Sequence, residues 1–247
     1  MREEILPSKN LSEAKYKIAG AVFSAQFKYD YCRGLFSPFL YTGEDKPLFY
    51  IDTNDSDIQK EMEICETKSI YYCEGVLAHR KVCERLLELE LAFPLHCSAV
   101  AVDGEAYLFT ADSGVGKSTH TSLWKEFFMD RAVIVNDDKP FIGFIEGKAY
   151  VYGSPWNGKH DLGCNIKAPI KAICHLNRGK NNSIIKLDSF SMLKVLLSQT
   201  VRYESKAHTE KVIDYLTKLV SIVPSYKLNC DISKEAVEVS YKAMSGE

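Results

Sequence analysis

The sequence predicts a mixed α/β fold built around a phosphate-binding loop, and three observations lead to this fold class. An apolar run at 106–109 leads into a glycine-containing turn at 111–118, and a helix-like stretch begins near Thr119. Strand-like apolar runs and stretches of helical periodicity both occur along the rest of the chain. The 247 residues are 46% hydrophobic and 26% charged, which are ordinary values for a globular protein with a substantial core.

Composition and charge narrow the range of partners and compartments. The net charge of −2 gives no general attraction to nucleic acid or to anionic membranes, so we expect neither as a partner. The first ten residues lack the apolar core of a secretory signal, and no run approaches membrane-spanning length. We therefore expect a cytoplasmic protein, whose oligomeric state the sequence leaves open.

The cysteines favour neither a metal cluster nor a disulfide framework. Eight cysteines are scattered along the chain without any C-x-x-C pair. Cysteines at such spacings more often fill apolar cores. We expect reduced, buried thiols.

Residues 1–90 are predicted to form a β-rich subdomain closed by a helix. Short apolar runs typical of strands are separated by polar breakers such as 54–57, and one longer stretch has apolar positions near helical spacing. The predicted strands cover 15–27, 47–52 and 69–73, and the predicted helix covers 75–91. We find no catalytic constellation in this part of the chain.

Residues 91–247 are predicted to form the larger part of the fold and to hold the functional site. Asp103-Gly104 lies between two β-rich runs, which is a strong hairpin signal. The second hairpin strand leads to the glycine turn, and apolar pairs four residues apart mark the buried face of the helix that follows it. The predicted strands cover 95–102, 106–110, 132–135, 141–145, 148–152, 168–176, 183–187 and 226–230.

Three further helices complete the prediction. The first begins near Asp188 or Ser189 as its N-cap, and the second covers about 207–220, before Pro224. The last is capped by Asp231 and runs to about Met244.

The segment 111–118 has the pattern of a phosphate loop. A strand that leads into a tight glycine turn leaves backbone N–H groups free to bind a polyphosphate at the start of the next helix. In this pattern Lys117 supplies a positive charge for catalysis, and the Ser118 hydroxyl reaches Mg²⁺. Ala111 stands where the pattern has its first glycine. The predicted nucleotide-binding residues are Asp112, Ser113, Gly114, Val115, Gly116, Lys117, Ser118 and Thr119.

Two adjacent carboxylates, Asp137 and Asp138, follow the apolar strand 132–135. Phosphoryl transfer to a hydroxyl needs a carboxylate for Mg²⁺ and another to accept the proton. Neighbouring residues of an extended chain point to opposite sides, so the two should differ in role. His96 lies fifteen residues before Ala111 on the neighbouring hairpin strand, and whether it faces the phosphates depends on the strand register.

At this point a family resemblance is visible. Part of the chain resembles the core of bacterial HPr kinase/phosphorylase, whose fold is shared with phosphoenolpyruvate carboxykinase. The resemblance is carried, in this order, by His96, the segment A-D-S-G-V-G-K-S, the segment V-N-D-D, residues 149–155 and finally L-N-R-G at 176–179. The resemblance covers about 91–180. It implies a mixed β-sheet core, ATP with Mg²⁺, and catalytic roles for His96 and for an Asp that deprotonates the acceptor hydroxyl. By this analogy Asp137 is the base, Asp138 and Ser118 face the metal, and Arg178 contacts the substrate.

The chain also departs from HPr kinases. Thr119 follows the loop serine where those enzymes usually carry Glu, and the segment after Arg178 lacks their glycine-rich loop, so we do not expect HPr itself as the acceptor. Overall the chain resembles small carboxykinase-like or HPr-kinase-like proteins that share the loop S-P-W-x-G-K-H. In this loop Trp156, Lys159 and His160 are the candidate acceptor-binding residues.

Three functions are compatible with these residues. The first is an ATP-dependent kinase for a hydroxyl, either on a small metabolite or on a Ser of a peptide or protein. The second is a carboxykinase-type lyase, although none of the seven arginines adjoins the glycine loop or the Asp pair along the sequence. The third is a nucleotide-binding regulatory or accessory protein.

Overall fold

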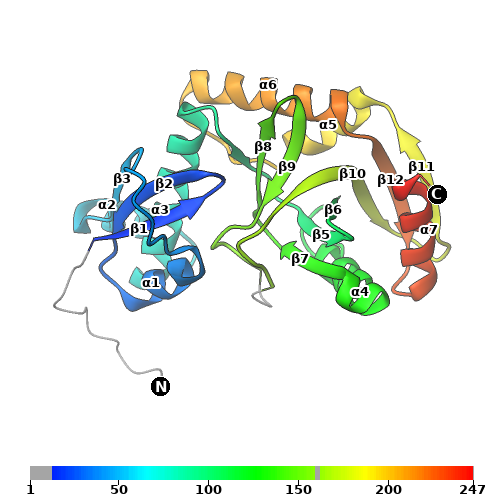
Figure 1. The fold of residues 1–247 in the computed structure, drawn as a ribbon, viewed down its shortest axis with the longest axis horizontal. Helices are drawn as coiled ribbons and strands as arrows, with labels where there is room; N and C mark the ends of the chain where they lie inside the picture. Colours follow the sequence, from blue (N-terminus) through cyan, green and yellow to red (C-terminus); the bar gives the residue numbers. More distant parts are fainter. Residues whose placement is uncertain (1–12, 159–161, 247) are drawn as a thin grey trace. The chain divides into compact units, whose positions relative to one another are not determined.

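The structure is a computed structural model that describes residues 13–158 and 162–246. The chain divides after Leu91 into an N-terminal and a C-terminal unit (Figure 1).

The N-terminal unit is a three-stranded sheet with helices. Its order is β1-β2-β3, in which β1 and β2 form an antiparallel hairpin and β3 pairs parallel with β2. A buried carboxylate stabilises the start of the first helix, because Glu74 accepts hydrogen bonds from the backbone N–H groups of Lys28 and Tyr29. The elements are β1 (Ala14–Ile18), β2 (Ala21–Gln26), α1 (Asp30–Phe36), η1 (Ser37–Phe39), β3 (Tyr50–Asp52), α2 (Asp55–Ile64) and α3 (Ile70–Glu88).

Two predictions for this unit were wrong. The expected strand 69–73 is the start of α3, with Ser69 as the N-cap, because Cys73 and Leu77 form one buried stripe that packs on Ile58 of α2. The polar segment 54–57 was expected to interrupt regular structure, but it forms the N-cap and the first turn of α2. The Asn54 side chain accepts a hydrogen bond from the Asp57 backbone N–H at 2.9 Å, which is the N-cap role that favours Asn at helix starts.

The C-terminal unit is built on a mixed nine-stranded sheet with helices on it, so the mixed α/β class holds. The main path runs β4-β8-β9-β10-β6-β5-β7, and β12 pairs with both β10 and β11. The long strand β10 joins the two parts of the sheet, since it pairs antiparallel with β9 at its start and parallel with β6 and β12 further along. The strands are β4 (Phe93–Pro94), β5 (Ser98–Val102), β6 (Glu105–Thr110), β7 (Ala132–Asn136), β8 (Phe141–Ile145), β9 (Lys148–Tyr152), β10 (Lys167–Arg178), β11 (Ser183–Leu187) and β12 (Ser225–Cys230).

The helices of this unit lie in two groups. Figure 1 shows α4 against β5, β6 and β7, with α7 beside α4 and against β10, β11 and β12, and α5 and α6 along another side of the unit. Trp124 of α4 is fully buried against Tyr107 and Phe109 of β6, which fixes the helix on the strand that precedes it. The helices are α4 (Lys117–Phe128), η2 (Met129–Arg131), α5 (Ser189–Leu197), α6 (Lys206–Ile222) and α7 (Lys234–Ser245).

Local turn and cap signals were predicted with mixed success. The Asp103-Gly104 hairpin is confirmed, and Glu146-Gly147 joins β8 to β9 in the same way; all four residues have the positive φ that such turns require. The expected cap at Asp188 is also confirmed. The cap at Asp231 was wrong, because Ser233 accepts from the Ala236 backbone N–H and Asp231 belongs to the turn before the helix.

Strand directions bring several chain segments to one edge of the sheet. Strands β6, β10 and β12 are mutually parallel, so their carboxyl ends lie at the same edge. Strand β5 is antiparallel to both β6 and β7, so β5 begins and β7 ends at that edge too. The segments that meet there are the one before β5, the one after β7, the glycine loop (111–118) after β6, and the ends of β10 and β12.

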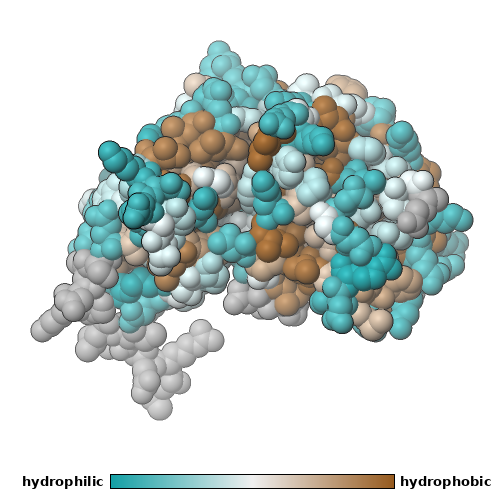
Figure 2. All heavy atoms as spheres, viewed as in Figure 1, coloured by the Kyte–Doolittle hydropathy of each residue, from teal (hydrophilic) through white to brown (hydrophobic). Residues whose placement is uncertain are grey.

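The surface is that of an ordinary folded protein. Hydrophilic residues cover much of the face in Figure 2, with hydrophobic residues between them in separate patches. Among the helices in the described ranges, none is long and apolar enough to span a bilayer.

Candidate functional site

The glycine loop connects β6 to α4 with backbone geometry that needs glycine at two positions. Gly114 has φ +79° and Gly116 has φ +120°, values that side-chain-bearing residues rarely adopt. Ala111 keeps φ outside this region and is fully buried, so the alanine is accommodated without backbone strain. The loop therefore keeps its shape although one glycine of the pattern is missing.

Lys117 begins α4 and is 93% buried, with 7% of its surface exposed. Its Nζ donates a hydrogen bond to the Ala111 carbonyl at 2.9 Å, so the ammonium group folds back over the glycine loop. Burial lowers the pKa of Lys117, and the nearby Cys97, Asp138 and Asp112 partly offset that shift. The first N–H groups of α4 add positive potential at the same place.

A cavity of about 630 Å³ opens in front of the glycine loop, and we call it the loop cavity. Its lining combines four of the segments that meet at the sheet edge. They contribute His96 before β5, the glycine loop after β6, the Asp pair after β7, and Arg178 at the end of β10. The structure thus brings together the glycine loop, the Asp pair, His96 and Arg178, which are separated by up to 82 residues along the chain.

Asp137 is almost fully buried and lies between the glycine loop and the 153–158 segment. Its Oδ1 accepts a hydrogen bond from the Gly158 backbone N–H at 2.6 Å. Its carbonyl oxygen lies 3.4 Å from Ser118 Oγ and accepts a hydrogen bond from it. Asp137 is therefore held by backbone contacts from two sides.

Asp138 lies beside His96, with Oδ1 3.3 Å from His96 Nε2. Burial raises the pKa of this carboxyl, but the hydrogen bond from His96 and the charges of Lys139 and Lys117 outweigh it, so the net shift is downward. Asp138 consequently stays ionised at neutral pH. The strand register, which the sequence did not settle, places His96 on the site.

Asn136, which was not predicted as a site residue, holds the backbone of the Asp pair in place. This fully buried side chain accepts hydrogen bonds from the N–H groups of Asp138 and Lys139, at 2.9 and 2.7 Å. Its amide nitrogen donates to Asn157 Oδ1 at 2.8 Å and to Ser154 Oγ at 3.1 Å. Asn136 thereby ties the Asp pair to the 153–158 segment; its only signal in the sequence was its place in V-N-D-D.

Arg178 contacts the glycine loop directly. Its guanidinium donates to the Gly114 carbonyl at 2.6 Å and to the Val115 carbonyl at 3.0 Å. No arginine adjoins the loop along the sequence, but the parallel pairing of β10 with β6 places one there in space. The positions of the arginines along the sequence therefore do not count against a lyase, because Arg178 lies at the glycine loop in the folded unit.

The predicted acceptor residues are only partly described. The Trp156 ring packs edge-on against Phe141, with 6.1 Å between ring centroids. Lys159 and His160 lie outside the described residues. The neighbouring Asn157 and Gly158 line the loop cavity.

A second hollow, which we call the side cavity, adjoins the loop cavity. It measures about 310 Å³, and the two share His96 and Asp138. Its other wall is the 198–201 segment, which is held to the segment before β5 by a hydrogen bond of 2.7 Å from the His96 N–H to the Gln199 carbonyl. Asp138 therefore borders two cavities, the loop cavity and the side cavity.

The donor set fits Mg²⁺ held together with a polyphosphate. Among the described residues, no group of three or more His, Cys, Asp and Glu side chains could hold a metal by itself. Mg²⁺ needs no such cage, because it is usually bound by one or two carboxylates together with phosphate oxygens and water. Ser118 and Asp138 line one cavity with the glycine loop, which matches this kind of site.

Gly158 lies too close to Asp137 for any side chain. A Cβ at this position would be 2.9 Å from Asp137 Oδ2 and 3.2 Å from its Cγ. We expect Gly158→Ala to displace the carboxylate and to lower turnover by roughly 10²-fold, as for a misplacement of ~1 Å. Steady-state kinetics with the acceptor would measure this. Gly34→Ala is the control, because a Cβ there meets nothing within 4 Å, and equal turnover of the two variants would contradict the role given to Gly158.

His120 of α4 gives a prediction about acid stability. Burial lowers the pKa of this histidine from 6.5 to about 4. In the unfolded chain His120 takes up a proton below pH 6.5, whereas in the folded unit it does so only near pH 4, so stability falls as the pH drops through this window. We expect a loss of about 3 kcal/mol in the free energy of unfolding between pH 7 and 4 from this group. Denaturant titrations at both pH values should show a smaller loss in His120→Gln; equal losses would contradict the assignment.

Comparisons with known proteins do not identify a family for this chain. No protein-family model matches the chain, and no curated protein matches it. Among solved structures, the Hpr(Ser) kinase/phosphatase from Coxiella burnetii is similar, with 9% identity and a TM-score of 0.35, over 62% of this chain and 95% of that chain. At this TM-score the likeness supports no functional argument, so the function must be inferred from the site.

Proposed function

We propose that the C-terminal unit is an ATP- and Mg²⁺-dependent kinase that transfers the γ-phosphate to a hydroxyl, on a small metabolite or on a Ser of a peptide or protein. The observation that carries the proposal is the loop cavity, in which a glycine loop with its lysine faces two carboxylates and a histidine. Phosphoryl transfer depends on positioning and on charge stabilisation, and these are the groups it requires.

The donor phosphates would lie over the glycine loop. Lys117 would exchange its hydrogen bond to the Ala111 carbonyl for a phosphate oxygen, which the reach of its side chain over the loop supports. Arg178 steadies the loop through the Gly114 and Val115 carbonyls. Mg²⁺, held by Ser118 and Asp138, would neutralise charge on the outer phosphates.

The two carboxylates would then divide the remaining work. Asp138 keeps its negative charge beside His96, which suits a residue that faces a cation. Asp137 would accept the proton of the acceptor hydroxyl as its oxygen attacks the γ-phosphorus and ADP leaves. The hydrogen bond from Gly158 fixes the direction of this carboxylate. The side cavity offers room for the rest of the acceptor.

The proposal is tested by incubating the protein with Mg²⁺-ATP and pools of metabolites and hydroxyl-bearing peptides, with mass detection of products. We expect one product heavier by a phosphoryl group, absent when Lys117→Ala is used. Phosphoenolpyruvate formed from oxaloacetate and ATP would overturn the proposal in favour of a lyase. ATP binding without any transfer across the pools would favour a regulatory role.

A further inference from the structure

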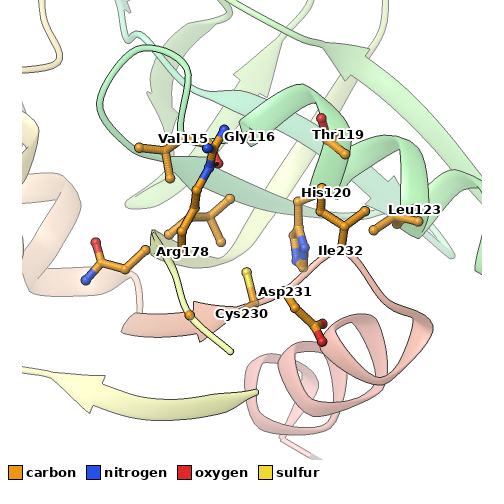
Figure 3. A pocket seen from close by; sticks show the side chains of 12 residues that line it. Val115, Gly116, Thr119, His120, Leu123, Arg178, Cys230, Asp231 and Ile232 are labelled. Atoms are coloured by element: carbon orange, nitrogen blue, oxygen red, sulfur yellow. Dashed lines mark hydrogen bonds between the residues drawn. The ribbon is translucent and has the colours of Figure 1, made fainter. Parts of the chain in front are cut away.

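The loop cavity adjoins two further cavities, and each of them borders a different part of the site. A third cavity, of about 430 Å³, is lined by His120 and shares Gly116 and Thr119 with the loop cavity (Figure 3). The side cavity instead shares His96 and Asp138 with the loop cavity. Among the described residues, none lines both the side cavity and the third cavity. The side cavity therefore borders the carboxylates and not the glycine loop.

Gln199 lines the side cavity with an amide whose oxygen is unused. The residue follows α5 and is only 7% exposed. The Ser198 hydroxyl donates to the Val195 carbonyl at 2.8 Å, so its oxygen can accept the hydrogen bond of 3.1 Å from Gln199 Nε2. These two bonds orient the amide with its nitrogen toward Ser198. Gln199 Oε1 is buried and has no hydrogen-bond partner among the described residues.

The backbone around Gln199 is fixed to the segment that carries His96. The Gln199 carbonyl accepts a hydrogen bond from the His96 N–H at 2.7 Å. Thr200 Oγ1 donates to the Pro94 carbonyl at 3.3 Å in the same pair of segments. Gln199 is thereby held at a defined place relative to His96, which lies beside Asp138. A residue that selects a ligand needs such support from its surroundings.

The charges at the side cavity favour an uncharged partner for Gln199. The negative charge of Asp138 is already shared, because Lys139 Nζ lies 3.6 Å from Asp138 Oδ2 and also lines this cavity. Under the proposed function Mg²⁺ adds positive charge at the same carboxylate. An ammonium group would be repelled by both cations, whereas a hydroxyl or an amide N–H can donate without bringing further positive charge.

We infer that Gln199 selects the acceptor: the side cavity binds a compound that carries, besides the hydroxyl to be phosphorylated, a second uncharged hydrogen-bond donor that pairs with Gln199 Oε1. The inference rests on the proposed function, because it places the reacting hydroxyl of the same molecule at the Asp pair. A compound that lacks the second donor leaves a buried acceptor unpaired, so the site rejects it.

The size of the side cavity limits the acceptor further. Its volume of about 310 Å³ is at the lower end of the range for small-molecule sites, roughly 300–1,000 Å³. A small polyol fits this description, and so does a Ser residue with the amide N–H of its own peptide backbone. Both sources supply the same chemistry, and the transfer measurement below distinguishes them.

The first measurement asks whether the Gln199 amide serves the fold or a ligand. Gln199→Met removes the unpaired oxygen and keeps the length of the side chain, and the exposed Ser198 can bond to water instead. We expect urea denaturation of the full chain to give this variant a midpoint equal to or above that of the wild type. Gln59→Met makes the same change at an exposed position of α2 and should leave the midpoint unchanged. A lower midpoint in Gln199→Met alone overturns the inference, because the amide then stabilises the fold.

The second measurement is phosphoryl transfer from Mg²⁺-ATP to four added acceptors. They are 1-propanol, 1,3-propanediol, 3-amino-1-propanol and N-acetylserine N-methylamide. We expect kcat/KM for the diol or for the blocked serine to exceed that for 1-propanol at least tenfold, and the better of the two identifies the source. The amino alcohol, charged at neutral pH, should be as poor as 1-propanol. Gln199→Met should lower kcat/KM for the better acceptor at least tenfold without changing KM for ATP, and Gln59→Met should change neither.

The outcomes separate this inference from the proposed function. If 1-propanol is phosphorylated as well as the diol and the blocked serine, or if Gln199→Met keeps the wild-type rates, the role of Gln199 is wrong while the kinase stands. If only a compound from the metabolite or peptide pools is phosphorylated, that compound must carry a second uncharged donor and must lose at least tenfold in Gln199→Met, or the inference is overturned. If the wild type phosphorylates nothing, the proposed function fails, and the inference fails with it.

Discussion

Asp137→Asn is expected to abolish most phosphoryl transfer while the protein stays folded and binds ATP. The amide cannot accept the proton of the acceptor hydroxyl, and loss of a general base lowers rates by roughly 10²- to 10⁴-fold. The amide oxygen can still accept the hydrogen bond from the Gly158 N–H, so the local geometry should persist. Single-turnover kinetics with the identified acceptor would measure the loss, and calorimetry would check that ATP affinity is kept.

Asp138→Asn is the matched comparison, because it makes the same replacement of a carboxylate by an amide at the neighbouring residue. Here we expect transfer to require a higher Mg²⁺ concentration, since a neutral amide binds the cation more weakly. A Mg²⁺ titration of the rate separates the two roles. If Asp137→Asn shifts the Mg²⁺ requirement and Asp138→Asn removes the proton-transfer step, the assignments are reversed. If both variants keep near-native rates, the site is elsewhere.

Lys117→Ala is expected to weaken ATP binding at least tenfold, about 1.4 kcal/mol, because a buried charge that faces the phosphates is lost. The fold should tolerate the change, since burial already disfavours the charged form of Lys117. Calorimetry with Mg²⁺-ATP measures the effect. Lys186→Ala, an exposed lysine of β11 in the same unit, is the control for the loss of one positive charge. Equal affinity of the wild type and Lys117→Ala would remove the glycine loop as the phosphate site.

The local sequence was sufficient to predict turns and helix caps, because these depend only on neighbouring residues. The Asp103-Gly104 turn requires positive φ at two consecutive positions, and these residues supply it. The Asp188 cap also depends on groups only a few residues apart. Local reasoning failed at 69–73, because the β-rich composition of five residues was outweighed by the packing of α3 on α2.

In the candidate site, too, features set by neighbouring residues could be predicted, whereas contacts between distant segments could not. The glycine loop, its lysine and the adjacent carboxylates could be singled out from the sequence, because each depends on residue types within one short segment. The sequence could not show that Arg178 caps the loop, that Asn136 links the Asp pair to 153–158, or that His120 faces a cavity. These contacts join segments from different strands or helices.

The sequence by itself therefore determined the mixed α/β class and singled out the segments that we propose to bind phosphate and to move a proton. Only the tertiary structure decided which of them meet. Parallel pairing of β6, β10 and β12, with β5 antiparallel between β6 and β7, brings the relevant strand ends to one edge of the sheet. The register then decides that His96 faces Asp138. Strand order and register arise from packing across the whole unit, since a shift of one residue would turn each side chain to the opposite face.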